Sequence, residues 1–345
     1  MKYACLLFFH VLAWLFQPRS YQVCIVAFYN LENFYDTVDN PLVNDDDFTP
    51  HGIKRYNGHI YTDKLDKLAT VISKIGAGIT PDGPALLGVA EIENDTVLRD
   101  LTHHPLLRKR QYQFIRFDSK DARGVDVGLL YQPAYFIPLH AEKLFVALPG
   151  NSKEAAFTRD ILYVKGSLAG EIIHIYVNHW PSRRGGEQRS APARAAAATV
   201  CRNHSRKLIA ADPHAKLILM GDLNDDPESP SVTEVLGAKG NREHIALQDW
   251  YNPWLALYRK GIGTLANRDS WGLFDQILLS GAWLSDRDTG FFYHHASIFA
   301  RDFMKEDRGR YKGYPMRTWD GNTYRGGYSD HFPTFVVLAR KNGLD

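Results

Sequence analysis

Polar side chains that can bind cations or transfer protons follow several apolar, strand-like runs of this sequence. Burying such groups without partners is costly, so their position indicates the ends of buried strands. Carboxylates, amides and imidazoles gathered at one end of a sheet can hold a hard divalent cation and move protons. The residues in these positions are Asn30, Glu91, Asn178, His179, Asp222, Asn224, Asp275, Asp330 and His331.

The segment GGYSDHFP, residues 326–333, shows the pattern most clearly. Asp330 and His331 stand side by side before the β-branched, apolar run 334–339, and Pro333 fits the start of a strand. A strand holds its first residues firmly, so an acid and a titratable base there can face a cleft. Glycine, serine and aspartate are equally typical of ordinary turns, so this segment alone does not decide between the two.

Each residue of the set also has an ordinary structural explanation when it is taken alone. Asn30 suits a turn, Glu91 suits a surface position, and Asp275 can pair with a nearby arginine. Unrelated turn residues, however, need not follow so many separate buried runs. We therefore interpret the set as one site built from strand ends.

The elements that must position these residues are mostly strands. Strands are predicted at residues 22–29, 85–90, 111–117, 125–131, 160–168, 171–178, 215–220, 273–279 and 334–339. Helices are predicted at residues 61–75, 96–102 and about 187–210. Many strands follow one another directly, which favours antiparallel or mixed sheets with helices on their outer faces. Long irregular segments are predicted at 36–59 and 291–328.

The composition is typical of a soluble globular protein. The 345 residues are 45% hydrophobic and 23% charged, and a net charge of +2 is too mild to indicate a nucleic-acid binder. No linker rich in proline, glycine or serine divides the chain, so residues 21–345 are predicted to form a single domain. Cys24 and Cys201 lie in strand-like and helix-like runs and are expected to be buried thiols.

Residues 1–20 differ from the rest of the chain. Lys2 precedes an apolar run over residues 3–16, which has the length of a signal-peptide core and is short for a membrane span. The sequence predicts a signal peptide or a short hydrophobic export segment here, and therefore a periplasmic, cell-surface or secreted protein. A short hydrophobic anchor is the alternative.

The ordered set of motifs resembles the endonuclease/exonuclease/phosphatase superfamily of deoxyribonuclease I-like enzymes, and most of all its exported bacterial branch. The motifs occur in the family's order over about residues 22–340. They are YNLEN, GVAEIEN, DVGLLY, VNHWPSR, GDLND, FDQILLS and SDHFP. The resemblance implies a four-layer α/β sandwich, in which two mixed β-sheets pack face to face with helices outside.

The resemblance also implies metal-assisted hydrolysis of a phosphoester. The cation is usually Mg²⁺, with Mn²⁺ or Ca²⁺ as alternatives, because oxygen ligands suit hard cations. Glu91 is expected to be the main metal ligand. Asn30 and Asp330 are expected to complete the surroundings of the metal, directly or through water.

The remaining residues of the set are expected to act on the phosphate and the attacking water. His331 would pair with Asp275 and act either as a base or as a cation that holds the phosphate. Asp222 would orient or deprotonate the water, and Asn224 would bind a phosphate oxygen. His179 would contact the phosphate or protonate the leaving oxygen.

A second group of residues consists of weaker candidates for contacts with substrate. Arg183 and Arg184 follow the histidine motif, where guanidinium groups can clamp phosphate, although a solvated basic loop is an equal alternative. Arg123 and Asp126, in the stretch ARGVDVGLL, and Asn178 complete this group.

Three kinds of function remain open at this point. The first is a secreted endonuclease or phosphodiesterase acting on nucleic acid, because residues 291–328 interleave basic and aromatic side chains. The second is a sphingomyelinase-like phospholipase C or an inositol-phosphate phosphatase, for which an exposed aromatic hairpin at 290–299 would be a signal. The third is a non-catalytic binding protein on the same fold, although no catalytic residue is lost. No obligate protein partner is implied.

Overall fold

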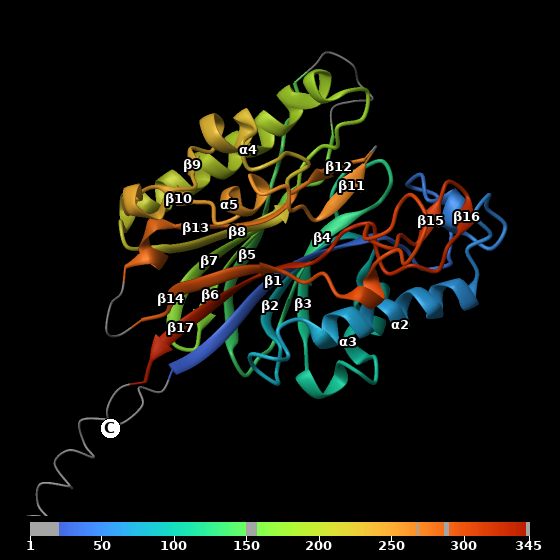
Figure 1. The fold of residues 1–345 in the computed structure, drawn as a ribbon, viewed down its shortest axis with the longest axis horizontal. Helices are drawn as coiled ribbons and strands as arrows, with labels where there is room; N and C mark the ends of the chain where they lie inside the picture. The colour runs from blue at the N-terminus through green and yellow to red at the C-terminus, as the bar shows by residue number, and fades with distance from the viewer. Residues whose placement is uncertain (1–20, 150–156, 268, 286–289, 343–345) are drawn as a thin grey trace, which may run out of the picture.

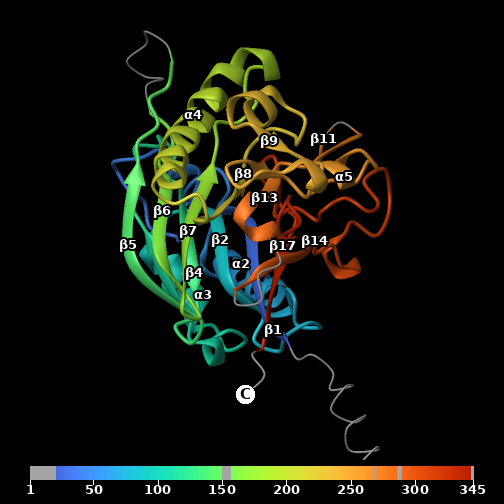
Figure 2. The same cartoon turned by 90° about the vertical axis from the view of Figure 1, so that its left-hand side faces the viewer.

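The computed structural model describes residues 21–149, 157–267, 269–285 and 290–342 (Figure 1). The predicted export segment, residues 1–20, lies outside the described residues. Two β-sheets packed face to face form the centre of the molecule, and helices cover their outer faces (Figure 1, Figure 2). The predicted four-layer α/β sandwich is confirmed.

The first sheet has six strands in the order β14-β17-β1-β2-β4-β3. They are β1 (Tyr21–Phe34), β2 (Pro84–Ile92), β3 (Gln113–Arg116), β4 (Asp126–Tyr131), β14 (Phe292–Ile298) and β17 (Thr334–Lys341). β1 runs parallel to β2 and antiparallel to β17. Residues 24–32 of β1 are buried without a break, as expected for a central strand covered on both faces.

The second sheet has seven strands in the order β5-β6-β7-β8-β13-β10-β9. They are β5 (Phe136–Leu144), β6 (Ile161–Leu168), β7 (Glu171–His179), β8 (Lys216–Asp222), β9 (Ala238–Lys239), β10 (Trp250–Tyr251) and β13 (Asp275–Ser280). The sequence did not predict β5, because this edge strand contains Pro138 and has no buried apolar run.

Apolar side chains from both sheets fill the space between them. Val26 and Val336 of the first sheet share one buried cluster with Ile175 and Met220 of the second. Gly88 of β2 lies so close to the other sheet that a Cβ atom there would come within 2.5 Å of Met220 Sδ. A side chain at Gly88 would therefore force Met220 to shift within the packed core.

Helices complete the outer layers. α2 (Gly58–Lys74) and α3 (Asp95–His103) pack on the first sheet, and α4 (Glu187–Ala211) packs on the second (Figure 1). The Asn57 and Asn94 side chains cap α2 and α3 by accepting hydrogen bonds from free backbone N–H groups. No helix within the described residues is long and apolar enough to cross a membrane.

The irregular segment predicted at 291–328 is wrong in part, because β14 lies within it and pairs with β17. An exposed aromatic hairpin at 290–299 would have been a signal for the alternative lipid or inositol phosphate hydrolase, but Phe291, Tyr293 and Phe299 are buried. The remainder of the segment contains a short 3-10 helix, Asp302–Met304, and the short hairpin of β15 (Trp319–Asp320) and β16 (Thr323–Tyr324). The cysteine prediction is confirmed, because both free thiols described are buried.

The topology brings strand ends together at one end of the sandwich. β1 and β2 are parallel, as are β7 and β8, so these pairs deliver their carboxyl ends to a common edge within each sheet. β17 and β13 run antiparallel to β1 and β8, so they begin at those same edges. This arrangement gathers polar residues that lie far apart in the sequence.

Candidate active site

Asp222 lies at the centre of the gathered strand ends. In the sheet register it stands between His179 on β7 and Asp275 on β13. Its Oδ2 accepts a hydrogen bond of 3.0 Å from Asn30 Nδ2, and its Oδ1 accepts one of 2.9 Å from the Asn224 backbone N–H. Burial raises the pKa of Asp222 to about 6, which places its titration near neutral pH.

His331 is held by a buried carboxylate. Its Nδ1 lies 2.7 Å from Asp275 Oδ2, which also accepts a 2.5 Å hydrogen bond from Thr264 Oγ1. Burial alone would lower the pKa of His331, but Asp275, together with Asp222 and Asp330, raises it well above its usual value. The neighbouring carboxylates therefore favour the charged form of the imidazole, and Nε2 is left for the cleft.

His179 has the opposite character. Its Nε2 lies 3.7 Å from Glu91 Oε1 and 3.7 Å from Asp222 Oδ2, while its buried Nδ1 has no hydrogen-bond partner among the described residues. Burial, followed by the charges of Arg159 and Arg123, lowers the pKa of His179 well below its usual value. This imidazole is therefore neutral at neutral pH.

Glu91 presents one carboxylate oxygen to the cleft. Its Oε2 accepts a hydrogen bond of 2.8 Å from the Asn33 backbone N–H, and its Oε1 lies 3.9 Å from Arg123 Nη1. The backbone of Glu91 has a φ of +60°, a left-handed conformation that is unfavourable for a residue with a side chain. Such strain persists where surrounding contacts enforce it, which is common at functional sites.

Asp330 borders the same space from the start of β17. Its Oδ2 accepts a hydrogen bond of 3.2 Å from Arg317 Nη2, and its Oδ1 lies 3.8 Å from His331 Nε2. Asn30 is connected to these residues through the hydrogen bond that its Nδ2 donates to Asp222 Oδ2. Its Oδ1 also accepts a 2.9 Å hydrogen bond from the Glu32 backbone N–H, so both ends of the Asn30 amide are engaged.

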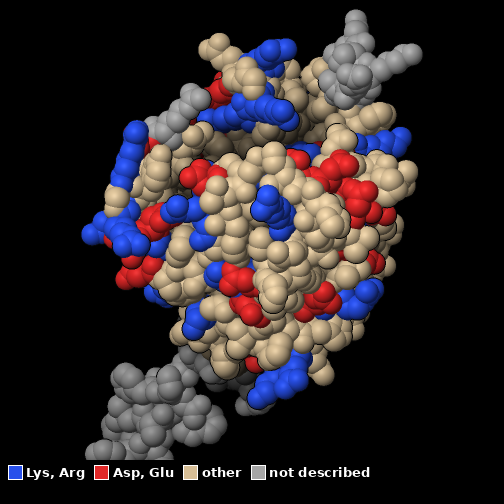
Figure 3. All heavy atoms as spheres, turned by 90° about the vertical axis from the view of Figure 1, so that its right-hand side faces the viewer, with Lys and Arg blue, Asp and Glu red and all other residues tan. Residues whose placement is uncertain are grey.

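A cleft of 760 Å³ opens above these residues. Among the predicted residues, those that line it are Glu91, Arg123, His179, Arg183, Arg184, Asp222, Asn224, Asp330 and His331. The end of the molecule that carries β15 and β16 is seen face-on in Figure 3, where the upper half is hollowed and Lys and Arg side chains gather at its rim. A phosphate needs only part of this volume, so the cleft can also hold the groups esterified to it.

The remaining predicted residues do not line the cleft. Asn178 is buried below it and accepts a 3.0 Å hydrogen bond from Trp180 Nε1. Asp126 is buried on β4 and accepts a 2.9 Å hydrogen bond from Arg116 Nη2. Asp275 also lies behind the cleft, where it reaches the site through His331. The structure therefore gives Asn178 and Asp126 positions that support the fold.

Most of the chain, including all of these strand ends, matches a known family. The family model described as Endonuclease/Exonuclease/phosphatase family matches residues 25–340. The chain belongs to this family. Its members hydrolyse phosphoester bonds. Among curated proteins, none matches the sequence significantly.

Solved structures of the family share the fold at low sequence identity. A family member from Bacteroides thetaiotaomicron is 17% identical, with a TM-score of 0.57 over 94% of this chain and 97% of that chain. A mannosyl-6-phosphatase from Bacteroides thetaiotaomicron VPI-5482 is 17% identical, with a TM-score of 0.56 over 91% and 99%. D. rerio TDP2 in complex with a single-strand DNA product is 15% identical, with a TM-score of 0.54 over 92% and 99%.

Two groups of side chains in this family member have the donor atoms for a metal ion. Ligand atoms of Asp222, Asp275 and His331 lie within 4.8 Å of one another. In this group Asp275 Oδ2 is already bonded to His331 Nδ1 and to Thr264 Oγ1, behind the cleft. Glu91 and Asp330 offer carboxylate oxygens at the cleft surface and fit a hard divalent cation better.

The sequence did not point to the far wall of the cleft. This wall is formed by Tyr258 and by the hairpin of β11 (Leu265–Asn267) and β12 (Ser270–Gly272), which carries Trp271. Thr264, which precedes β11, was also missed, although it bonds Asp275. The only signal was WGLFD itself, where an aromatic residue and glycine precede the acid of the motif.

Proposed function

We propose that this chain is a divalent-metal-dependent phosphodiesterase that is exported and cleaves nucleic acid. One observation carries the proposal. A neutral imidazole, His179, and a cationic one, His331, flank Asp222 at the floor of a cleft. Titratable groups whose surroundings push their pKa values apart are typical of general acid and base pairs.

In this proposal, four side chains have separate roles in hydrolysis. The cationic His331 holds a non-bridging phosphate oxygen and offsets charge that develops in the transition state. Asp222, with a pKa of about 6, orients the attacking water and accepts its proton. His179 donates a hydrogen bond to the phosphate from Nε2. Asn224 shapes the floor, since its Nδ2 donates a 2.9 Å hydrogen bond to the Trp180 carbonyl.

The cation of this proposal is Mg²⁺, held by Glu91 and Asp330. When bound, it polarises a phosphoryl oxygen and neutralises negative charge. The Asn33 N–H already engages Glu91 Oε2, which leaves Oε1 for the ion. Arg123 Nη1 lies 3.9 Å from Glu91 Oε1, so its guanidinium can contact the phosphate whose oxygen the ion polarises.

Nucleic acid is the substrate class that the cleft supports best. Arg123 and Arg184 line the cleft, and Arg183 stacks at 4.5 Å on the ring of Phe274 in its wall. The ring centroids of Trp271 and Tyr314 lie 5.3 Å apart, and Tyr314 belongs to the segment 291–328 with its interleaved basic and aromatic side chains. These rings are surfaces on which bases can stack. Because Phe291, Tyr293 and Phe299 are buried, the segment 290–299 gives less support to a lipid hydrolase.

Hydrolysis assays with residues 21–345 test the proposal. Plasmid DNA, RNA, sphingomyelin, an inositol polyphosphate and mannose 6-phosphate are offered in parallel with Mg²⁺, with EDTA and His331→Ala as controls. Cleavage of nucleic acid that both controls abolish is the expected result. Turnover of only a lipid, an inositol phosphate or a sugar phosphate would overturn the substrate assignment. Secretion of the full chain into the periplasm or medium tests the export prediction.

A further inference from the structure

Besides the two groups at the active site, a third group of side chains that can bind a metal lies on the outer face of the second sheet. His140 and Glu142 belong to the edge strand β5, and His204 belongs to α4, which packs on β6 and β7 (Figure 2). His140 and Glu142 are two residues apart, so their side chains point to the same face of the strand. Two imidazoles and a carboxylate are a ligand set typical of Zn²⁺.

The three side chains approach one another at distances that are longer than those of ordinary hydrogen bonds. Glu142 Oε1 lies 3.5 Å from His140 Nε2 and 3.9 Å from His204 Nε2. Hydrogen bonds between such atoms are about 2.7–3.2 Å long, whereas ligand atoms around a tetrahedral Zn²⁺ lie about 3.3 Å apart. His140 is exposed, so a rotation of its ring can bring Nε2 to an ion that His204 also binds.

The ring of Tyr163 packs against both histidines. Its centroid lies 4.5 Å from that of His204, edge to face, and 6.2 Å from that of His140. Glu142 is the residue opposite Tyr163 in the register of β5 and β6. The three side chains therefore share one aromatic neighbour, and the group is partly organised before a metal binds.

His204 has the properties of a metal ligand. Burial lowers the pKa of His204, with the charge of Glu142 opposing the shift, and this favours the neutral imidazole that metals require. Nδ1 of His204 lies 2.8 Å from the hydroxyl oxygen of Tyr176. When Nδ1 donates its proton to that oxygen, Nε2 keeps its lone pair and can face an ion. Outer partners of this kind commonly fix the tautomer of metal-binding histidines.

We propose that His140, Glu142 and His204 bind Zn²⁺, with water in the fourth position. The ion joins the edge strand β5 to α4 and stabilises the folded state, because it binds only where the fold brings the three side chains together. None of the three lines the 760 Å³ cleft of the active site. The inference is therefore independent of the proposed function.

The test measures metal binding directly, by isothermal titration calorimetry of the metal-free protein with ZnCl₂. His140→Ala and His204→Gln each remove one imidazole, and Tyr176→Phe removes the outer partner of His204. Because the side chain of His140 is exposed, His140→Ala keeps the proposal testable if His204→Gln does not fold. Melting temperatures without metal report the purely structural cost of each variant.

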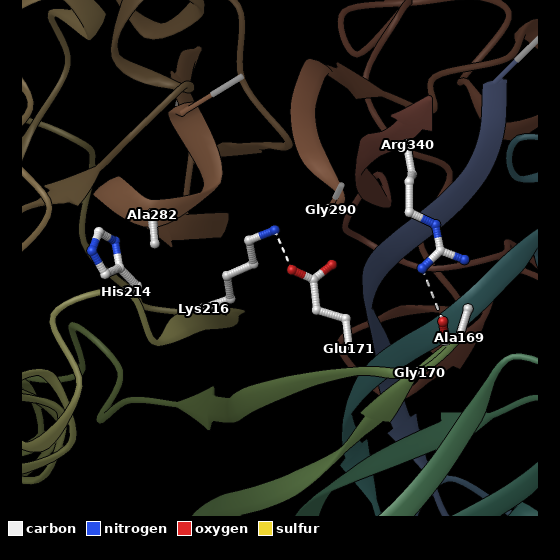
Figure 4. Close-up of a pocket in the computed structure, with 8 residues that line it drawn as sticks. All are labelled: Ala169, Gly170, Glu171, His214, Lys216, Ala282, Gly290 and Arg340. Carbon is white, nitrogen blue, oxygen red and sulfur yellow. Dashed lines mark hydrogen bonds and ion pairs between the residues drawn. The ribbon is translucent and has the colours of Figure 1, made fainter. Parts of the chain in front are cut away.

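The matched control is His214→Ala. His214 is also exposed, but it lies beyond the end of α4 and lines a separate pocket of 310 Å³ together with Glu171 (Figure 4). None of the three proposed ligands lines that pocket. Zn²⁺ bound at the active site is common to all these variants, so the difference between them reports the proposed site.

The expected result is one Zn²⁺ fewer per chain in His140→Ala and in His204→Gln, with the wild-type number in His214→Ala. Tyr176→Phe is expected to keep the ion with a Kd about 10-fold to 100-fold higher. The melting temperature of the wild-type protein should rise on addition of ZnCl₂ by more than that of His140→Ala, since an ion that binds the folded state stabilises it.

Three outcomes would overturn the proposal. The first is the same number of ions and the same Kd in the wild-type protein and in His140→Ala. The second is an equal loss in His214→Ala, because any exposed imidazole would then account for the binding. The third is a wild-type melting temperature that ZnCl₂ leaves unchanged, which would show that no ion joins β5 to α4.

Discussion

Replacement of Asp275 by asparagine tests whether this carboxylate and His331 act as one unit. Asp275 is fully buried, and its Oδ2 is the partner of His331 Nδ1 at 2.7 Å. The change is nearly isosteric, so it removes charge without opening a cavity. Thr264 can still donate its hydrogen bond to the amide oxygen, which keeps the local packing.

The magnitude follows from the charge that is lost, because an amide oxygen in the place of Oδ2 can still accept the hydrogen bonds of both Thr264 and His331. A hydrogen bond to a charged partner contributes about 1.5–3 kcal/mol and one to a neutral partner about 1 kcal/mol, and about 1.4 kcal/mol corresponds to a factor of ten in rate. We therefore expect kcat to fall about 2-fold to 30-fold in Asp275→Asn. The pKa of His331 should also fall, because the influence that opposes burial most strongly is the charge of Asp275. Activity that needs the imidazolium is then lost at a lower pH than in the wild type.

The assay is a pH profile of kcat combined with a double-mutant cycle. If the pair is one unit, Asp275→Asn combined with His331→Gln is no slower than His331→Gln alone. Glu171→Gln, a change of carboxylate to amide far from the cleft, should leave the profile in place. Additive losses in the double variant, or an unmoved alkaline limb in Asp275→Asn, would refute the reasoning.

Three further predictions concern single groups. Glu91→Ala should abolish metal-dependent hydrolysis while the circular dichroism spectrum persists, and full activity would remove Glu91 from the metal site. Arg123→Ala should raise KM for DNA about 10-fold, with a weaker dependence of KM on salt, because one phosphate contact is lost; an unchanged salt dependence would argue against it. Burial lowers the pKa of His174 from 6.5 to about 4. Between these two pH values the folded state binds fewer protons than the unfolded state, so the free energy of unfolding falls as the pH drops from 6.5 to about 4. The loss is about 3 kcal/mol, and His174→Gln should flatten the dependence of urea unfolding on pH, whereas an equally steep dependence would show that another group is responsible.

The sequence was sufficient to predict where the chemistry lies along the chain. Central strands such as β1 and β8 are buried on both faces, so their apolar runs stop where the polar site residues begin. Edge strands give no such signal. β5 and β14 were missed because each has only one neighbouring strand and few fully buried residues.

The partners of each polar side chain could not be predicted in the same way. The Asn30 amide turned out to bond Asp222 across the two sheets, and this depends on how the sheets pack rather than on local sequence. Asn178 has the same sequence context as its neighbour His179, but alternation along β7 turns the two side chains in opposite directions. One therefore faces the cleft and the other bonds Trp180.

The two histidines show how topology, more than composition, decides the chemistry. His179 and His331 are equally buried, with exposures of 4% and 6%, so desolvation opposes the charged form of both. They differ at Nδ1. Antiparallel pairing of β13 with β8 places Asp275 where it can bond His331, while Nδ1 of His179 has no partner among the described residues. Asp275, at the start of β13, thus raises the pKa of His331, whereas burial lowers the pKa of His179. Two imidazoles whose pKa values are shifted in opposite directions suit acid and base catalysis at a phosphate.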